Sequence, residues 1–388
     1  MRLVIVYFGP FDVNSAIQAF HFGNDLTELG WEVTLAGRGD PERIRVVGEP
    51  RFECVSHHEL AARSATLRRD AEGTIVLAWT PREPVRRATK PFVELGIPYV
   101  VHLEDNEDHL LAVQLGHTVD ELRRLPLATQ DRLAPRELAH PTHGLEFLRA
   151  AVGLTMITEE LNEFNVAARP HHVARPGIDT ELFRPDLEPP LRREQLGIDP
   201  EEFVLVYHGT VHYANQHEML SLYLAVHLLA RRGRRVRLVR LGDTALGGVD
   251  PRSFGALRHG VVELGVVDWR QVPGYLALAD GFVQPGAPDD FNRYRLPSKL
   301  PEFLAMGRPV VLPRCNIGND LADGRNALLL ERGDALEIAA CIETLLDDRE
   351  LASRLGEGAR KFALEELNWE DNSVRLAAFL REMLAARA

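Results

Sequence analysis

Residues 3–37 read LVIVYFGPFDVNSAIQAFHFGNDLTELGWEVTLAG and decide the class of fold. The opening run LVIVYF is apolar at every position, as expected of a strand that is buried on both faces of a parallel sheet. A turn is predicted at Gly9 and Pro10. Apolar residues then recur at helical spacing over Ala16–Leu29, Gly30 ends the helix, and WEVTLAG supplies the next strand. The stretch is therefore a βαβ unit.

The same alternation continues outward through the first half of the chain. Strands are predicted at TIVLAW (74–79), IPYVVHL (97–103) and VGLTMIT (152–158), the last of which closes the first domain. Residues 105–148 are polar and contain Pro126, Pro135 and Pro141, which predicts short helices and loops.

The second half restarts the pattern with FVLVYHG (203–209), a helix, and VRLVRLG. Further strands are expected at VVEL (261–264), GFVQP (281–285), PVVLP (309–313) and ALLL (327–330), and the tail from about 335 is amphipathic and helical. A chain of 388 residues fits two cores. The prediction is an α/β protein with one Rossmann-like domain over 1–178, a second over 179–370, and a helix at 371–388 that packs back on the first.

Composition excludes several classes of function. The net charge of -12 argues against general binding of nucleic acid, which requires a concentrated cationic face. No apolar run reaches the roughly 20 residues that cross a bilayer, so contact with a membrane is expected to be peripheral if it occurs. The odd, widely spaced Cys54, Cys315 and Cys341 favour a reducing cytoplasm.

The stretch most informative about chemistry is NRYRLPSKLPEFLAMGRPVV at residues 292–311. It places Ser298 and Lys299 at the expected start of an apolar helix, where amide groups and a lysine charge would favour a pyrophosphate. Glu302, about one turn later, suits the two hydroxyl groups of a ribose. The alternative is that Ser298 only caps the helix and Lys299 is solvated.

This stretch, followed by DGRNALLLERGD and DDRELASRLGEGAR, resembles the carboxyl-terminal domain of glycosyltransferase family 4 over residues 200–375. PGIDTELFRPD is similar to that family's linker, and LGVVDWRQVPGYLALADGFVQP to its nucleobase-side loop and strand. The resemblance implies the GT-B fold, two Rossmann-like domains facing across a cleft, and a hexosyltransferase that retains the anomeric configuration. The implied donor is a UDP or GDP sugar, and the implied acceptor is a carbohydrate, a lipid-linked sugar or a small molecule.

The resemblance also assigns residues to the donor. Ser298 and Lys299 match the phosphate-facing turn, and Glu302 matches the second glutamate of a pair and would bind the ribose. The remaining donor-side residues are the glycines after the first strands and the nucleobase loop, namely Gly9, Gly209, Gly265 and Val267.

Two departures from the family concern charge. Tyr294 stands where the first glutamate of the pair is expected, with Asp289 or Asp290 as substitutes. The loop HGTVHYANQHEM lacks the arginine and lysine that relatives place near the leaving diphosphate, so Arg293 or Arg295 is expected to supply that charge.

Neither a cofactor nor an essential metal is expected. The loop's His208, His212 and His217 lie four and five residues apart, and imidazoles beside a phosphate need no ion. The sequence also lacks a Gly-x-Gly-x-x-Gly fingerprint, which argues against NAD.

In the first domain, VVHLEDNEDHL follows a strand where the family has a histidine that touches the donor sugar. Counted along the strand, that position is Glu104, and alternation puts His102 on the same face. Glu104, His102 and Arg295 are thus the predicted catalytic residues, against the alternative of a solvated acidic run. Two other functions stay open: a sugar-nucleotide epimerase of the same fold, and a degenerate donor-binding subunit.

Overall fold

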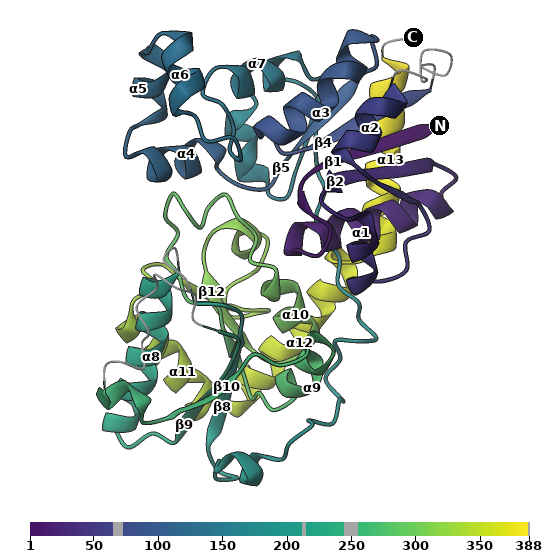
Figure 1. The fold of residues 1–388 in the computed structure, drawn as a ribbon. Coiled ribbons are helices and arrows are strands. Elements are labelled where there is room, and N and C mark those ends of the chain that lie inside the picture. The colour runs from purple at the N-terminus through teal and green to yellow at the C-terminus, as the bar shows by residue number, and fades with distance from the viewer. Residues whose placement is uncertain (65–72, 212–214, 244–254, 387–388) are drawn as a thin grey trace. The chain divides into compact units, whose positions relative to one another are not determined.

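The computed structural model describes residues 1–64, 73–211, 215–243 and 255–386. It divides into two compact units, each described here by itself. Unit 1 consists of Met1–Pro176 together with Trp369–Ala388, and unit 2 of Gly177–Asn368. Figure 1 shows both as helices packed around parallel strands.

Unit 1 is built on a parallel sheet of seven strands in the order β3-β2-β1-β4-β5-β6-β7. The strands are β1 (Arg2–Pro10), β2 (Glu32–Arg38), β3 (Glu53–Ser56), β4 (Thr74–Trp79), β5 (Tyr99–Leu103), β6 (Gly153–Met156) and β7 (His171–Val173). The chain builds outward from β1 in one direction and from β4 in the other. This order is that of a Rossmann-like domain, in which ligands bind at the carboxyl ends of the strands where the order reverses.

The helices of unit 1 are α1 (Asn14–Glu28), α2 (His57–Ser64), α3 (Glu83–Glu94), α4 (Glu107–Leu115), α5 (Val119–Arg124), α6 (Leu127–Leu133), α7 (His143–Ala150) and α13 (Trp369–Ala385). The polar segment 105–148 holds the short helices α4 to α6 and the start of α7. Although α13 comes from the far end of the sequence, it lies beside α1 and buries Leu376, Leu380 and Met383 in the same core as Leu3 and Ile5.

The structure corrects three local predictions in unit 1. Gly9 and Pro10 do not form a turn, because β1 continues through them after a register shift that follows Val6. A proline is tolerated in a strand at such an irregularity. The short edge strands β3 and β7 were not predicted, so the strand at 152–158 is followed by one more.

Unit 2 contains β8 (Phe203–His208), β9 (Val236–Leu241) and β10 (Val261–Gly265) in the order β10-β9-β8, and β11 (Phe282–Val283), β12 (Val310–Pro313) and β13 (Leu328–Leu330) in the order β11-β12-β13. A parallel bridge from Leu205 to Gly281 joins the two sets. The order reverses between β8 and β11. All six strands lie where the sequence predicted them.

The helices of unit 2 are α8 (Gln216–Arg231), α9 (Val272–Leu276), α10 (Lys299–Ala305), α11 (Ala335–Asp347) and α12 (Arg349–Glu366). Their apolar faces form one core with the strands, in which Phe282 and Phe303 stack with ring centroids 4.5 Å apart. Both units are thus Rossmann-like α/β domains.

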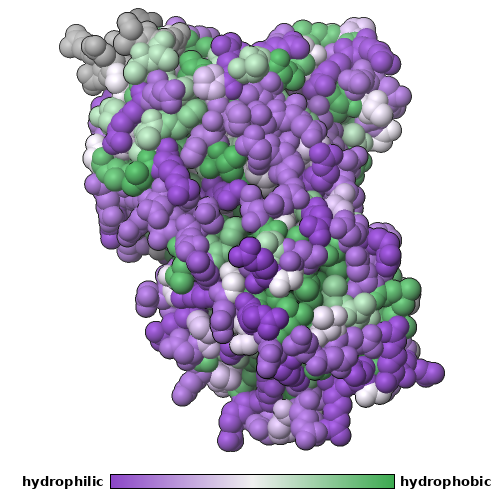
Figure 2. Space-filling view, turned by 180° about the vertical axis from the view of Figure 1, so that it is seen from behind, coloured by the Kyte–Doolittle hydropathy of each residue, from purple (hydrophilic) through white to green (hydrophobic). Residues whose placement is uncertain are grey.

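Among the described residues, no helix combines the length and apolar character needed to cross a membrane. In Figure 2, hydrophilic residues cover most of the face shown, and hydrophobic residues gather in patches between them.

Candidate functional site

The carboxyl ends of β8, β9 and β10 are lined by glycine backbone. Gly209, Gly242 and Gly265 all have positive φ, at 117°, 110° and 70°. The Gly242 N–H donates to the Gly265 carbonyl at 2.7 Å, and a Cβ on Gly242 would lie only 2.5 Å from the Gly209 carbonyl oxygen. Side chains are therefore excluded from this contact, and the glycines give a ligand direct access to backbone.

Lys299 lies across this backbone. Its Cε would be 3.1 Å from a Cβ on Gly209, and its Nζ lies 5.1 Å from the centre of the Tyr207 ring. α10 begins at Lys299, and the exposed Ser298 before it makes no capping hydrogen bond within the described chain. The sequence alternative in which Ser298 caps the helix is therefore not what the structure shows.

Glu302 meets His208 at the end of β8. His208 Nε2 and Glu302 Oε2 lie 2.6 Å apart, but their alignment is not that of a hydrogen bond. Both atoms are buried, and neither has a hydrogen-bond partner in the part of the chain that the structure describes. The two side chains therefore face each other at the carboxyl end of β8.

Arg295 is held in an ion pair. Its Nη2 lies 3.1 Å from Glu218 Oε2 and donates to Asn292 Oδ1 at 2.7 Å, while the guanidinium stacks 3.8 Å from the centre of the Phe291 ring. Burial raises the pKa of the Glu218 carboxyl, against the opposing effect of Arg295. Glu218 therefore balances the positive charge of Arg295, which was predicted from the sequence to neutralise the leaving diphosphate.

The other charged residues of the segment 289–295 are more exposed than Arg295. Arg293 has 38% of its side chain exposed and lies 3.9 Å from Asp290, whereas Tyr294 is buried. Asp289 accepts hydrogen bonds from the backbone of Phe291 and Asn292, so its carboxylate closes a turn. Asp290, the other substitute for the missing glutamate, has 83% of its side chain in solvent.

Arg240 supports the glycine backbone from inside the unit, a role that was not predicted from the sequence. The residue is 2% exposed, and its Nε donates to Glu263 Oε2 at 2.7 Å. Its Nη1 lies 3.4 Å from the Gly209 carbonyl oxygen and 3.2 Å from that of Asp243. Arg240 thus fixes the loops after β8 and β9. These contacts could not be predicted, because the sequence shows only an arginine within an apolar strand.

The predicted nucleobase loop follows β10. Gly265 ends the strand with nothing within 4 Å of the position of a Cβ. Val267 is partly buried against the core of unit 2, whereas Val266 between them is 76% exposed. Of the three loop histidines, His212 lies outside the described residues. His208 ends β8 and His217 lies in the first turn of α8.

In unit 1, Glu104 directly follows β5 and is 7% exposed. Burial raises the pKa of its carboxyl to about 7, with a further contribution from Asp105 and an opposing one from Arg82. A carboxyl with this pKa gains or loses its proton near neutral pH, which suits proton transfer.

Arg82 and Thr80 follow the strand next to β5 and have unusual features that were not predicted from the sequence. Arg82 is buried, its Nε lies 2.9 and 3.0 Å from the two oxygens of Glu107, and its guanidinium stacks 4.2 Å from the centre of the Phe8 ring. Thr80 is buried with a φ of 79°, which is strained for a residue with a branched side chain. Thr80 and Arg82 follow β4, Glu104 and Glu107 follow β5, and Phe8 lies in β1, and the strand order reverses between β1 and β4.

His102 and Gly9 lie deeper in unit 1 than the sequence suggested. His102 is 1% exposed, its Nδ1 is 2.9 Å from Thr155 Oγ1, and its ring packs 4.3 Å from the Trp79 ring. Burial lowers the pKa of His102 to about 3, with a smaller effect of His172. Gly9 is buried within β1, where a Cβ would lie 2.9 Å from Tyr7 Oη. The structure therefore places both in the core.

Comparison with known proteins agrees with this architecture. Residues 202–348 match the family model described as Glycosyl transferases group 1. Alpha-D-kanosaminyltransferase of Streptomyces kanamyceticus is 24% identical over 389 residues, covering 90% of this chain and 97% of that enzyme. D-inositol 3-phosphate glycosyltransferase of Arthrobacter sp. (strain FB24) is 25% identical over 273 residues, covering 66% of this chain and 62% of that enzyme.

Among solved structures, that of Anabaena Alr3699/HepE in complex with UDP-glucose has a TM-score of 0.72 at 14% identity, covering 98% of this chain and 100% of that one. This likeness shows the fold, and the family model and the named relatives show the class of enzyme. The chain is therefore a glycosyltransferase with the GT-B fold.

Proposed function

We propose that the enzyme transfers a hexose from a nucleoside-diphosphate sugar to an acceptor hydroxyl with retention of anomeric configuration. The observation that carries the proposal is the group of residues at the strand reversal of unit 2. There Lys299 lies over Gly209, and Glu302, about one turn further along the chain, has its Oε2 2.6 Å from His208 Nε2. A lysine over bare backbone suits a diphosphate, and a carboxylate about one turn later suits a ribose.

The proposed reaction breaks the bond between the anomeric carbon and the diphosphate oxygen, which leaves with the electron pair. The acceptor oxygen bonds to the same face of the anomeric carbon, and its proton passes to the leaving phosphate. Lys299, which lies over the Gly209 backbone, stabilises the charge that grows on the diphosphate. Arg295 contributes less than the sequence suggested, because Glu218 already balances it.

Glu104 is the proposed polar contact of unit 1 with the reacting sugar or the acceptor. A carboxyl that titrates near neutral pH can accept a hydrogen bond from a sugar hydroxyl when ionised and donate one when protonated. His102, which is buried and paired with Thr155, is proposed to hold the strand before Glu104 in place.

The test is titration with UDP and with GDP by calorimetry, in wild type and in the variants Lys299→Ala and Glu302→Ala. Each substitution is expected to weaken binding of the preferred nucleotide about tenfold or more, because each removes a charge-assisted contact. Lys361→Ala is the matched control, since Lys361 is an exposed lysine of α12 in the same unit. Equal affinity in all four proteins would refute the donor site.

Two further measurements address the reaction itself. NMR of the product reports whether the anomeric configuration of the donor is kept. Incubation with the donor sugar alone, followed by separation of its epimers, tests the alternative of an epimerase. The proposal expects retention and no epimer.

A further inference from the structure

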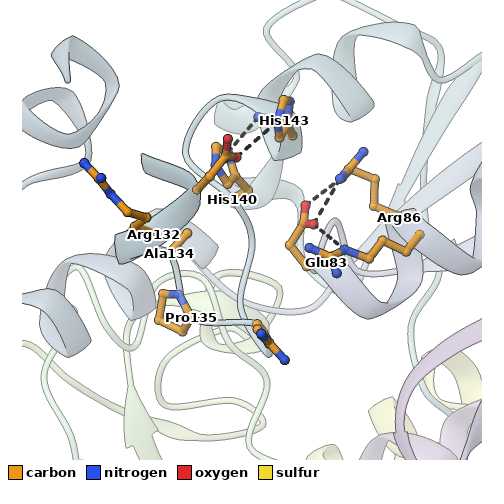
Figure 3. A pocket seen from close by; sticks show the side chains of 10 residues that line it. Glu83, Arg86, Arg132, Ala134, Pro135, His140 and His143 are labelled. Atoms are coloured by element: carbon orange, nitrogen blue, oxygen red, sulfur yellow. Dashed lines mark hydrogen bonds and ion pairs between the residues drawn. The ribbon is translucent and has the colours of Figure 1, made fainter. Parts of the chain in front are cut away.

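Unit 1 contains a pocket of about 620 Å³ that the donor site does not use. Its walls come from the start of α3, from α6, and from the segment that leads into α7. Figure 3 shows His140 and His143 side by side on one wall, and Glu83 with Arg86 on another. The pocket thus lies mainly in the irregular segment 105–148.

The pocket is cationic in a chain that is strongly acidic. It is lined by Arg86, Arg87, Arg132 and Arg136, against the two carboxylates Glu83 and Asp131. Four positive charges minus two negative ones leave a formal charge of +2 with neutral histidines, whereas the whole chain carries -12. Such a local excess favours a dianion.

Glu83 fixes two of these arginines. Arg86 donates to both of its oxygens, at 2.6 and 3.0 Å, and Arg87 Nε donates to one of them at 3.0 Å. Burial opposes the ionisation of Glu83, but the bonds from Arg86 and Arg87 outweigh it and lower the pKa of its carboxyl. Because Arg carries five N–H donors, both guanidinium groups keep donors for a ligand.

His140 adds a buried donor. Its Nδ1 accepts the N–H groups of Thr142 and His143 at 3.2 and 3.1 Å, so a neutral ring carries its proton on Nε2. Nε2 lies 3.2 Å from Asp131 Oδ1 without the alignment of a hydrogen bond, and it is buried with no other partner in the described chain. His140 itself is 4% exposed.

The same geometry argues against a metal ion, although Asp131, His140 and His143 have ligand atoms within 4.8 Å of one another. A ligating histidine needs a free lone pair on one nitrogen and usually donates from the other. In His140 both roles are reversed, because Nδ1 is the acceptor and Nε2 carries the proton. The surrounding arginines would also repel a cation.

We propose that this pocket binds a phosphate group of the acceptor, so that the substrate class is a phosphorylated hydroxyl compound. This inference rests on the proposed glycosyl transfer. A phosphate monoester carries close to two negative charges at neutral pH, matching the formal charge of the pocket. The forked N–H groups of arginine match its oxygens.

The position of the pocket within unit 1 supports a role in binding the acceptor. α3 follows β4, and Glu104 follows the neighbouring strand β5, so both lie at the same edge of the sheet. Arg82 connects them, since it pairs with Glu107 while the next residue, Glu83, lines the pocket. A hydroxyl compound held here by its phosphate lies on the side of the sheet that carries Glu104.

The test uses calorimetric titration with inorganic phosphate, glycerol 3-phosphate and glycerol in chloride buffer. The variant Arg132→Gln/Arg136→Gln removes two exposed charges of the pocket, and Arg124→Gln removes an exposed arginine of α5 that does not line it. Both phosphates are expected to bind wild type and Arg124→Gln alike, with an affinity about tenfold lower in the double variant. Glycerol is expected not to bind.

Equal phosphate affinity in the double variant, or none in wild type, would overturn the proposal. So would stoichiometric binding of Zn²⁺ that is lost in His143→Ala while phosphate gives no signal, because the pocket would then be a metal site. UDP and GDP titrations of the same proteins separate this inference from the donor site. Loss of nucleotide binding in every protein with phosphate binding intact would refute the acceptor role.

Discussion

Replacing Glu104 with glutamine should remove a large part of the pH dependence of stability. The folded-state pKa is about 7 against an ordinary value of 4.5, which is a difference of about 2.5 units. At about 1.36 kcal/mol per unit, the folded state loses about 3.4 kcal/mol of stability as Glu104 ionises.

The sign follows from proton counts. Between the two pKa values the folded state binds more protons than the unfolded state, so stability falls as pH rises. The contribution of Glu104 is fully present below pH 4.5 and is lost as pH rises to about 7. Glutamine stays neutral, so the variant should gain on wild type by about 2.5 kcal/mol between about pH 5 and about pH 8.

The assay is urea unfolding of both proteins at the two pH values. Glu94→Gln serves as a control, because Glu94 is a carboxylate of unit 1 with 64% of its side chain exposed. Parallel pH profiles for wild type and Glu104→Gln would refute the argument, because Glu104 would then titrate alike in the folded and unfolded states.

Three further outcomes are expected. Gly242→Ala should destabilise the protein by about 1–3 kcal/mol and weaken nucleotide binding, because its Cβ would lie 2.5 Å from a carbonyl oxygen. The control Gly255→Ala, which has open space around the position of its Cβ, should have neither effect. Melting curves with and without UDP compare the two variants. Arg240→Met should cost about 3–5 kcal/mol in urea unfolding, because Glu263 loses its countercharge and keeps only the hydrogen bond from Tyr223 among the contacts described. Adding Glu263→Gln, which is neutral and can still accept that bond, should recover most of the loss. Treatment with EDTA should leave the transfer rate, followed by release of the nucleoside diphosphate, unchanged, because Lys299 is proposed to supply the charge that a metal otherwise provides.

The sequence predicted elements well where a strand is central and apolar. TIVLAW corresponds to β4 residue for residue, because a strand buried on both faces has no polar positions to obscure it. β3 and β7 were missed because each has only four or three residues and little apolar character, as in ECVS and HHV. Pro10 was read as a turn because its pairing with Arg38 depends on a register shift that no local pattern reveals.

The residues of the candidate site could be selected from the sequence, but the contacts that they make could not. Lys299 and Glu302 were proposed from their place at the start of a helix, because that spacing is local, and the structure confirms only the helix. The partners His208 and Glu218 are 94 and 77 residues away from Glu302 and Arg295. Whether a charge is available to a ligand or balanced by the protein depends on these distant pairs, so only the structure could show it.

The position of α13 in unit 1 has a consequence for how the protein is made. A ribosome synthesises residues 177–368 before it adds Leu376, Phe379, Leu380 and Met383, which complete the core of the first 176 residues. The first 176 residues therefore wait with apolar surface uncovered until the end of the chain emerges, and such surface is a usual target of chaperones. Premature termination near residue 368 would leave that surface open permanently and mark the product for degradation.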